Sequence, residues 1–387
     1  MVGLGVKNVG VRPRNWDECG KKVKTDRRDA LSLLSCLDRH VAGNTEALTS
    51  IRVPAEAEEQ SRSGTRQRSQ PLEHRQRLAV PATTDYFPAM ISPPKIEDVR
   101  QAHARIQLYV RRTPVLTSAL LDRETGARLF FKCENFQKAG AFKSRGACNA
   151  VFLLPETEAR RGVATHSSGN HAAALARAAA LRGIRAHIVM PKNSPKPKQL
   201  AVAGYGGRIV LCEPTLAARE QTCAAVMAET GATLIHPYDD DRIIAGAATA
   251  ALELLEDVPD LDAIIAPVGG GGLLSGTSLT VKSLRPGVRV YGAEPAQADD
   301  AAESLRAGRV VSKPANTIAD GLRTMLSERT FAIIRQNVDG IETVGEQGIV
   351  GAMRRLWEIM KIVVEPSGAV AFAVVREHAA QFAGQRV

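Results

Sequence analysis

The chain has 387 residues, of which 44% are hydrophobic, and it carries a formal net charge of +10. That length and apolar content suffice for a sizeable core in about two or three domains. No apolar run reaches the roughly 18 residues that a membrane helix requires, and the first residues lack the apolar segment of a signal peptide, so we expect a cytoplasmic protein without membrane contact. Basic residues are spread along the chain, which disfavours a nucleic acid partner. The six cysteines show no CxxC pair, as expected for reduced thiols.

Residues 1–85 differ in composition from the rest of the chain. Residues 56–78 are rich in Arg, Gln, Glu and Ser, which favours a solvated helix or disorder. The runs at 23–30 (VKTDRRDA) and 51–54 (IRVP) resemble a fragment of an insertion-sequence transposase with a DEDD catalytic domain. The segment holds no complete acidic set, so we assign it no nuclease activity. The resemblance implies foreign sequence fused upstream of an enzyme that starts at Met90, and the alternative is a regulatory or nucleic-acid-binding extension.

From Met90 onward, apolar runs of strand length alternate with Ala-rich or amphipathic stretches of helix length. Strands separated by helices of about 10–15 residues favour mostly parallel sheets with helices on both faces. The sequence therefore predicts an α/β fold. The expected strands are 129–132, 162–165, 186–190, 208–211, 233–235, 263–268 and 288–294. The expected helices are 92–109, 172–181, 197–203, 216–230, 243–256, 273–284 and 369–382.

The stretch at residues 132–147 (KCENFQKAGAFKSRGA) places a lysine between an aromatic residue and a small-residue helix start. A lysine with a partly dehydrated amine has a lowered pKa and can attack a carbonyl, although a single lysine is normally a solvated surface residue. The whole string closely resembles the cofactor-linked segment of pyridoxal-phosphate enzymes in the threonine dehydratase and serine racemase family. The resemblance implies that Lys143 carries the cofactor and takes part in catalysis, and that Phe142 contacts the cofactor.

Four consecutive glycines stand between an expected strand and an expected helix. Without Cβ atoms, their N–H groups can converge on an anion, and the helix N-terminus adds favourable potential. A tight structural turn is the alternative interpretation. The run matches the family's loop for the cofactor phosphate, which assigns to that loop Gly269, Gly270, Gly271, Gly272 and Leu273.

A second strand-to-helix junction is polar, at residues 165–171 (THSSGNH). Short polar side chains there could simply cap the helix. The family resemblance implies instead that Ser168 is the acid/base facing the lysine across the cofactor. It also implies that Asn170 bonds the cofactor's phenolic oxygen, and that Ser167 and His171 help to hold the substrate carboxylate.

Residues 294–300 (EPAQADD) bring three carboxylates and several carbonyls together after an expected strand. Hard divalent cations prefer such oxygen ligands, whereas an acidic surface turn is the commoner fate of such a sequence. Resemblance to the racemase branch implies a structural Mg or Ca site formed by Glu294, the carbonyl of Ala298, and Asp300.

Three further assignments follow from the resemblance. The run 317–322 (TIADGL) lines the cofactor's face through Gly321, and the run 365–369 (EPSGA) places Glu365 near the pyridine ring. Without the resemblance, both would be ordinary turns. Arg219 falls where some racemases and hydroxyaspartate dehydratases carry an arginine that faces the substrate carboxylate, although an exposed helix arginine is the default.

The sequence also departs from the family pattern. Ala173 and Ala247 stand where relatives often have glutamine, and Ala139 and Ala141 replace the frequent Thr and Ser around the lysine. Family members end in a strand with Ser-Gly-Gly-Asn, whose serine bonds the pyridine nitrogen. This sequence reaches its last residues, 384–387, where that strand should begin, so we expect the large sheet to lack it and to leave backbone groups unpaired.

The resemblance implies fold type II, like tryptophan synthase β, with two open twisted sheets. The expected large, cofactor-binding domain comprises residues 90–161 plus 240–387, and the small domain 162–239. We expect a homodimer that acts on an amino acid, namely a dehydratase that converts L-threonine, L-serine or 3-hydroxyaspartate to a 2-oxo acid and ammonia. The alternatives are serine racemase and an inactive remnant of such an enzyme.

Overall fold

The computed structural model describes residues 93–387. The described residues belong to one compact unit, Ile91–Val387. The predicted N-terminal extension, its resemblance to a transposase and the expected start at Met90 lie outside the described residues. Within residues 93–387, no helix combines the length and apolarity needed to cross a membrane.

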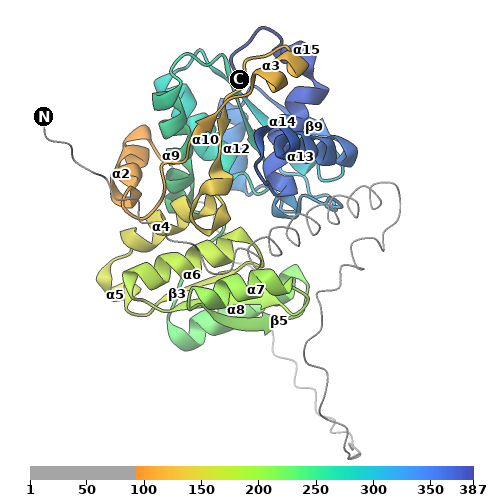
Figure 1. Cartoon of the computed structure of the whole chain (residues 1–387). Helices are drawn as coiled ribbons and strands as arrows, with labels where there is room; N and C mark the ends of the chain where they lie inside the picture. The colour runs from red at the N-terminus through yellow and green to blue at the C-terminus, as the bar shows by residue number, and fades with distance from the viewer. Residues whose placement is uncertain (1–92) are drawn as a thin grey trace, which may run out of the picture. The chain divides into compact units, whose positions relative to one another are not determined.

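Within the described residues, one sheet has four parallel strands in the order β5-β4-β3-β6 (Figure 1). Every residue of β4 is buried, so both faces of this sheet are covered. The helices that pack on it are α6, α7 and α8. Its elements are β3 (Val163–His166), α6 (Asn170–Arg182), β4 (Ala186–Pro191), α7 (Lys196–Gly204), β5 (Arg208–Cys212), α8 (Leu216–Thr230) and β6 (Thr233–Leu234).

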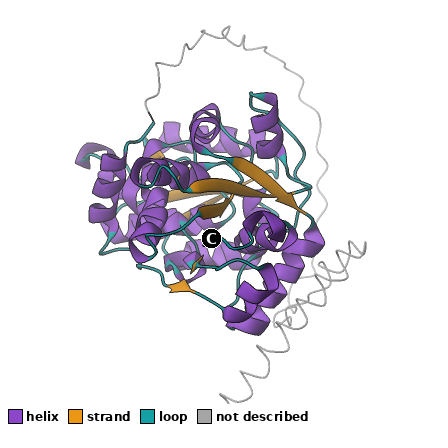
Figure 2. Cartoon of the chain, turned by 90° about the horizontal axis from the view of Figure 1, so that it is seen from above, coloured by secondary structure: helices purple, strands orange, loops and turns teal. Residues whose placement is uncertain are grey.

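A second parallel sheet, in the order β7-β8-β9, lies in the C-terminal half of the described chain. In Figure 2, the strands run through the middle of the molecule between helices. The elements of this half are β7 (Ala263–Pro267), α10 (Gly272–Leu284), β8 (Arg289–Pro295), α11 (Asp300–Ala307), η3 (Asp320–Leu322), α12 (Glu328–Asn337), β9 (Gly340–Val344), α13 (Glu346–Met360), α14 (Pro366–Glu377) and α15 (Ala379–Phe382).

Helices α4 and α9 pack between the helices of the two sheets. Helix α4 packs on α6 and on α9, and α9 packs in turn on α10 and α2. An antiparallel pair, β1 with β2, leads into the segment before α4. These elements are α2 (Ile96–Ile106), β1 (Val115–Leu116), α3 (Ala119–Thr125), β2 (Phe131–Lys132), η1 (Glu134–Phe136), η2 (Lys138–Gly140), α4 (Lys143–Leu153), α5 (Glu156–Ala159) and α9 (Asp241–Asp257).

Glycines let α4, α9 and α10 pack at backbone distance. A Cβ on Gly246 would lie 2.6 Å from the Cα of Gly146 and 2.7 Å from the carbonyl oxygen of Arg145. A Cβ on Gly276 would lie 2.7 Å from the carbonyl oxygen of Ile244. Backbone atoms cannot rotate away as side chains can, so these positions require glycine while the helices keep this spacing.

The last residues of the sequence lie between two segments far apart in the chain. Arg386 forms a parallel bridge to Arg128, and the N–H of Val387 donates to the carbonyl of Arg128. On the other side, the carbonyl of Arg386 accepts from the N–H of Asp262 and of Ala263, at the start of β7. We expected the sheet to lack a strand where the sequence reaches residues 384–387. In the structure, these residues pair with the backbone on both sides, at Arg128 and at the start of β7.

The predicted α/β fold with parallel sheets is confirmed, and each expected strand from 129–132 onward overlaps an observed one. The sequence analysis missed β9, the longer helices α12 and α13, and the shorter helices α3, α5 and α11. The strand β9 (GIETV) carries a glutamate and is only partly buried, so its apolar signal is weak. The split of Ile91–Val387 into a large and a small domain stays a prediction.

We predict that Gly246→Ala destabilises the protein by about 1–3 kcal/mol, because the new methyl group overpacks a contact between backbones. Unfolding in urea, followed by circular dichroism, measures the change. Gly204→Ala in α7 is the matched control, since nothing lies within 4 Å of the added Cβ. Equal unfolding midpoints for the two variants would contradict the prediction.

Candidate active site

The strand order of the first sheet has a switch point at its carboxyl edge, between the loops after β3 and β6, and we call this place the crevice. The chain moves from β3 outward to β4 and β5, then returns to place β6 on the other side of β3. Loops leaving neighbouring strands in opposite directions leave an opening at such a switch point, where α/β proteins bind ligands. The loops after β3 and β6 meet here, and the rings of His166 and His236 are 5.7 Å apart in an edge-to-face contact.

Lys143 is the first residue of α4, and its amine reaches this crevice. Its Nζ donates a hydrogen bond to the carbonyl oxygen of Pro237 at 2.9 Å and lies 5.0 Å from the centre of the Phe142 ring. Burial lowers the pKa of the amine from 10.5 to about 8, although the Glu365 carboxylate opposes the shift. About a tenth of the amine is therefore in the neutral, nucleophilic form at pH 7, far more than for an ordinary lysine.

The helix α6 starts at the same crevice without a side-chain cap, after Gly169. Unpaired N–H groups at a helix start can hold an anion. The Ser167 hydroxyl accepts a hydrogen bond from the N–H of Gly169 at 3.4 Å. The Ser168 hydroxyl makes no hydrogen bond with another residue of 93–387, so it is free to serve a ligand.

The His171 side chain is buried, and one of its ring nitrogens contacts the protein backbone. Its Nε2 lies 3.1 Å from the carbonyl oxygen of Ile235, so Nε2 carries the proton. Burial, with a smaller effect of Lys143, lowers the pKa of this imidazole to about 3. The ring is therefore neutral at pH 7 and its Nδ1 is a hydrogen-bond acceptor. Such an atom can bind a hydrogen-bond donor but not a carboxylate. The group of His171 that suits a substrate carboxylate is its backbone N–H.

Asn170 connects the start of α6 to the second sheet's helices. Its Nδ2 donates to both carboxylate oxygens of Glu365, at 2.8 and 3.1 Å. Glu365 remains accessible to solvent, but the surrounding protein partly desolvates it and raises the pKa of its carboxyl group, an effect that the Asn170 hydrogen bond opposes. Nearby, Lys198 of α7 forms an ion pair with Asp320 of η3.

The glycine loop between β7 and α10 packs too closely for side chains. A Cβ on Gly270 would lie 2.3 Å from the Tyr238 ring, and one on Gly269 would lie 2.9 Å from the Cα of Leu322. Gly271 has φ +85° and begins α10 without a side-chain cap. The loop is therefore a backbone surface with N–H groups at a helix start, which can hold a phosphate.

The predicted run 317–322 reaches the glycine loop. The N–H of Gly321 donates to the Ser367 hydroxyl at 3.0 Å, and the Gly321 carbonyl lies 3.3 Å from the Cβ position of Gly269. Ser367 belongs to the run 365–369, on the first turn of α14. Three segments that were predicted separately thus lie together.

Arg219 points from α8 toward the crevice. Its Nε is buried and has no hydrogen-bond partner among the described residues. Burial lowers the pKa of His166, and the charge of Arg219 lowers it further, which places the guanidinium close to that ring. The arginine is therefore not the exposed helix residue that its sequence context alone suggested.

The predicted metal ligands are buried at the start of α11. Both oxygens of Glu294 accept backbone N–H bonds, from Ala301 at 3.0 Å and Ala302 at 2.9 Å. Asp300 is 1% exposed and its Oδ2 has no partner among the described residues. No group of three or more His, Cys, Asp or Glu side chains suited to a metal occurs in this part of the chain. A cation would need backbone carbonyls such as that of Ala298.

Sequence reasoning missed the residues that follow β6. Pro237 supplies the carbonyl that holds the lysine, Tyr238 covers Gly270, and His236 contacts His166. The available signal was position, since all three follow the expected strand 233–235. Their importance emerges only once β6 is placed beside β3.

Comparison with known proteins gives consistent matches. A family model described as "Pyridoxal-phosphate dependent enzyme" matches residues 106–387. The chain is 51% identical over 295 residues to beta-hydroxyaspartate dehydratase of Paracoccus denitrificans, covering 76% of this chain and 94% of the relative. It is 52% identical over 281 residues to serine racemase of Arabidopsis thaliana, covering 72% of this chain and 85% of the relative.

Solved structures agree with these matches. The structure of maize serine racemase is similar with a TM-score of 0.75 at 47% identity, and the match covers 76% of this chain and 91% of that one. Serine racemase of Dictyostelium discoideum gives a TM-score of 0.73 at 47% identity, covering 76% of this chain and 95% of the other. A bacterial threonine deaminase gives a TM-score of 0.72 at 46% identity, covering 75% of this chain and 94% of the other.

We predict that Lys143 of the protein without ligand reacts with an amine-selective acylating reagent with a half-maximal rate near pH 8. Only the neutral amine reacts, and burial lowers the pKa of this group. Peptide mass spectrometry across a pH series measures the rate. Lys192, whose pKa is raised by the Glu213 carboxylate, is the internal reference. Titration of Lys143 near an ordinary lysine pKa of about 10.4 would contradict the prediction.

Proposed function

Because the chain belongs to the family of pyridoxal-phosphate dependent enzymes, we propose that it is a dehydratase of β-hydroxy amino acids. It converts 3-hydroxyaspartate, L-serine or L-threonine to a 2-oxo acid and ammonia. The observation that carries this proposal is the desolvated amine of Lys143, held between the start of α6 and the loops of the crevice. The similarity to a beta-hydroxyaspartate dehydratase and to threonine deaminase supports it.

The residues present fit pyridoxal phosphate. The cofactor's phosphate suits the glycine loop, Gly269 to Gly272 with Leu273, where a Cβ on Gly270 would collide with Tyr238. Its aldehyde suits the partly neutral amine of Lys143, beside Phe142. By the family resemblance, its phenolic oxygen would be bonded by Asn170, and its ring would lie beside Gly321 and Glu365.

Bound pyridoxal phosphate supplies an electron sink that stabilises negative charge at the α-carbon of the amino acid. Lys143 and Ser168 exchange protons with that carbon from opposite sides. The N–H groups at the start of α6, with Ser167, hold the α-carboxylate and orient the Cα–H bond. Loss of the α-proton and of the β-hydroxyl, which leaves as water, gives an enamine. Hydrolysis of the enamine yields the 2-oxo acid and ammonia.

Serine racemisation is the second candidate. The Ser168 hydroxyl has no partner within 93–387, so it can return a proton to the α-carbon on the side opposite Lys143. Such reprotonation inverts the amino acid without losing the hydroxyl group. The similarity to serine racemases of Arabidopsis thaliana and maize supports this reaction as well.

Arg219 favours a substrate with a second carboxylate. Its unpartnered Nε beside His166 suits the side-chain carboxylate of 3-hydroxyaspartate, because a buried guanidinium donor needs an acceptor. Serine and threonine leave that donor unpaired. Among the three substrates, we therefore favour 3-hydroxyaspartate.

The finer assignments are also proposals. Glu294, the Ala298 carbonyl and Asp300 hold Mg or Ca, supported by the unpartnered Asp300 Oδ2. The protein acts in the cytoplasm as a homodimer. Residues 1–85 derive from a transposase fragment and are dispensable, because the family match begins at residue 106. A chain that starts at Met90 should retain cofactor binding.

We predict that pyridoxal phosphate gives the wild-type protein a visible absorption band that borohydride removes, and that Lys143→Ala lacks this band. Lys143 is the amine that forms the link, so removing it leaves only loosely bound cofactor. Lys192→Ala, which removes an exposed lysine, is the control and keeps the band. Production of 2-oxo acid from serine, threonine and 3-hydroxyaspartate completes the test. If wild type and Lys143→Ala behave alike, a non-catalytic remnant of the family describes the chain better.

We predict that Arg219→Met lowers kcat/KM for 3-hydroxyaspartate about ten- to a hundredfold and changes that for serine little. A hydrogen bond to a charged group contributes about 1.5–3 kcal/mol, and about 1.4 kcal/mol corresponds to a factor of ten. Steady-state kinetics with both substrates measure the difference. Arg160→Met, an exposed arginine beside Glu156, is the control. An equal loss for both substrates would refute a role in substrate choice.

A further inference from the structure

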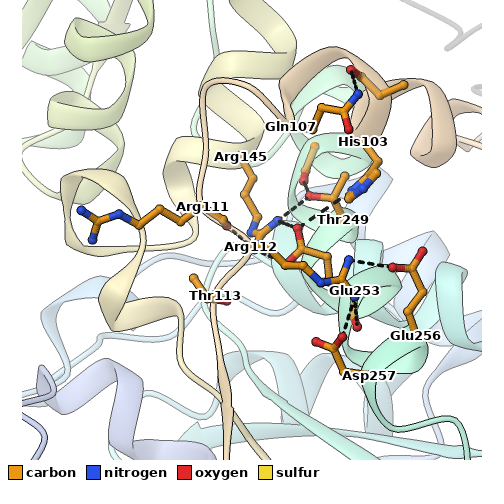
Figure 3. Close-up of polar contacts among 12 residues, drawn as sticks. His103, Gln107, Arg111, Arg112, Thr113, Arg145, Thr249, Glu253, Glu256 and Asp257 are labelled. Atoms are coloured by element: carbon orange, nitrogen blue, oxygen red, sulfur yellow. Dashed lines mark hydrogen bonds and ion pairs between the residues drawn. The ribbon is translucent and has the colours of Figure 1, made fainter. Parts of the chain in front are cut away.

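Four charged side chains from distant parts of the chain meet beside the first turn of α4, and we name Lys132, Glu134, Arg145 and Glu253 the buried charge cluster. Arg145 is fully buried. Its Nε and Nη2 donate to Glu134 at 2.8 Å, and its Nη1 and Nη2 donate to Glu253 at 2.8 Å, as Figure 3 shows for the second pair. Lys132 Nζ donates to Glu253 at 2.7 Å. The cluster itself has two cations and two anions, and at its edge Asp257 lies 3.9 Å from Lys132 and His103 lies 3.9 Å from Glu253.

The guanidinium of Arg145 uses all of its donors. Beyond the two carboxylates, Nη1 donates to the hydroxyl of Thr249 at 3.1 Å and Nη2 to the carbonyl of Arg111 at 3.3 Å. Burial by itself would raise the pKa of Glu253, but the hydrogen bonds from Arg145 and Lys132 lower it, so the carboxylate is ionised. The network is therefore geometrically determined, because a planar fork matches two carboxylates in one orientation only.

Stability alone is a weak reason for such a cluster. Desolvation offsets most of the attraction in a buried ion pair, and apolar side chains of the same volume often stabilise a core as well or better. A bidentate arginine does fix the distance and orientation of the segments that it joins. The segments joined here therefore indicate what the cluster does.

The cluster joins both sides of the lysine segment to α9. Arg145 follows Lys143 by two residues on the first turn of α4, and Glu134 lies in η1 before it, whereas Glu253 belongs to α9. The loop that leads into α9 carries the Pro237 carbonyl, which accepts from the Lys143 amine. The backbones of α4 and α9 are in contact at Gly246, so the two helices cannot move closer together.

We propose that Arg145 is a positioning residue for Lys143: its paired contacts with Glu134 and Glu253 hold the start of α4 against α9, so that the Lys143 amine stays at the Pro237 carbonyl and away from bulk water. The importance of this role for catalysis rests on the proposed function. The positioning itself involves only contacts within the protein and does not depend on a cofactor.

Position and charge predict opposite effects of a change in the cluster. The Glu365 carboxylate acts on the Lys143 amine, and the amine in turn lowers the pKa of the neighbouring His171 and His236 rings. Glu253→Gln leaves two cations with one anion, so a purely electrostatic influence would lower the pKa of Lys143. If the cluster holds the amine in place, the variant admits water to the amine and its pKa rises.

The experiment compares Glu253→Gln, Arg145→Lys and Thr249→Val with wild type in the protein without cofactor. The rate at which an acylating reagent modifies Lys143 is measured over about pH 6–11 by peptide mass spectrometry. For Glu253→Gln and Arg145→Lys we expect the pKa of Lys143 to rise by about one unit, which lowers the reactive fraction at pH 7 about tenfold. Thr249→Val removes the hydrogen bond from Arg145 Nη1 and the one that the Thr249 hydroxyl donates to the Gly246 carbonyl, but it leaves all four charges in place, so it should give a smaller rise. It serves if the other variants fail to fold.

Glu124→Gln is the matched control. Glu124 accepts from Arg355 and Arg376 in an ion cluster of α3, α13 and α14, so its loss destabilises the protein without touching α4 or α9. We expect a lower melting temperature with an unchanged pKa of Lys143. A fall in the pKa of Lys143 in Glu253→Gln, or no change in all three cluster variants, overturns the proposal.

Failure of the proposed function would look different. If wild type forms no borohydride-sensitive band with pyridoxal phosphate, the proposed chemistry is wrong. The labelling series still tests the role of Arg145, because it needs no cofactor. If the band forms in wild type and the cluster variants keep the wild-type pKa of Lys143, only the positioning role fails.

Discussion

The amine of Lys143 lies next to a carbonyl oxygen and is desolvated, and this environment depends on several elements that are distant in the chain. The amine reaches the crevice because α4 starts there, and the Pro237 carbonyl is present because β6 returns to lie beside β3. Desolvation then lowers the pKa of the amine to about 8. Because burial sets this pKa, the packing of α4 affects the reactivity of the amine as well as the stability of the fold.

Close contacts of glycine backbone fix the relative positions of the elements that form the candidate site. Gly246 brings α9 against α4, and Gly270 brings the loop before α10 against the Tyr238 ring. Contacts between backbones have few alternative arrangements, whereas contacts between long side chains have many. The buried charge cluster adds a second constraint at the same helix pair, through groups whose orientation is as restricted as that of the backbone.

Short-range patterns carried most of the prediction. The glycine loop, the lysine string and the polar turn at 165–171 are each one uninterrupted run, so their resemblance to the family's segments could be recognised in the sequence. Apolar runs indicated the strands. What the sequence could not show is pairing across long separations. Arg145 and Glu253 are 108 residues apart, and Pro237 is 94 residues from Lys143. Strand order decides which loops meet, and a sequence pattern does not reveal strand order. The weakly apolar β9 escaped detection for a local reason, since its side chains are only partly buried.

Two polar contacts join elements that flank the two sheets. Lys198 of α7 pairs with Asp320 of η3, and Asn170 of α6 bonds Glu365, so helices of one sheet are joined to elements of the other by partly exposed groups. Ions in solution compete with such contacts, whereas they hardly affect apolar packing. The strength of this link between the two halves therefore depends on ionic strength, whereas the close glycine contacts of the α4–α9 pair do not.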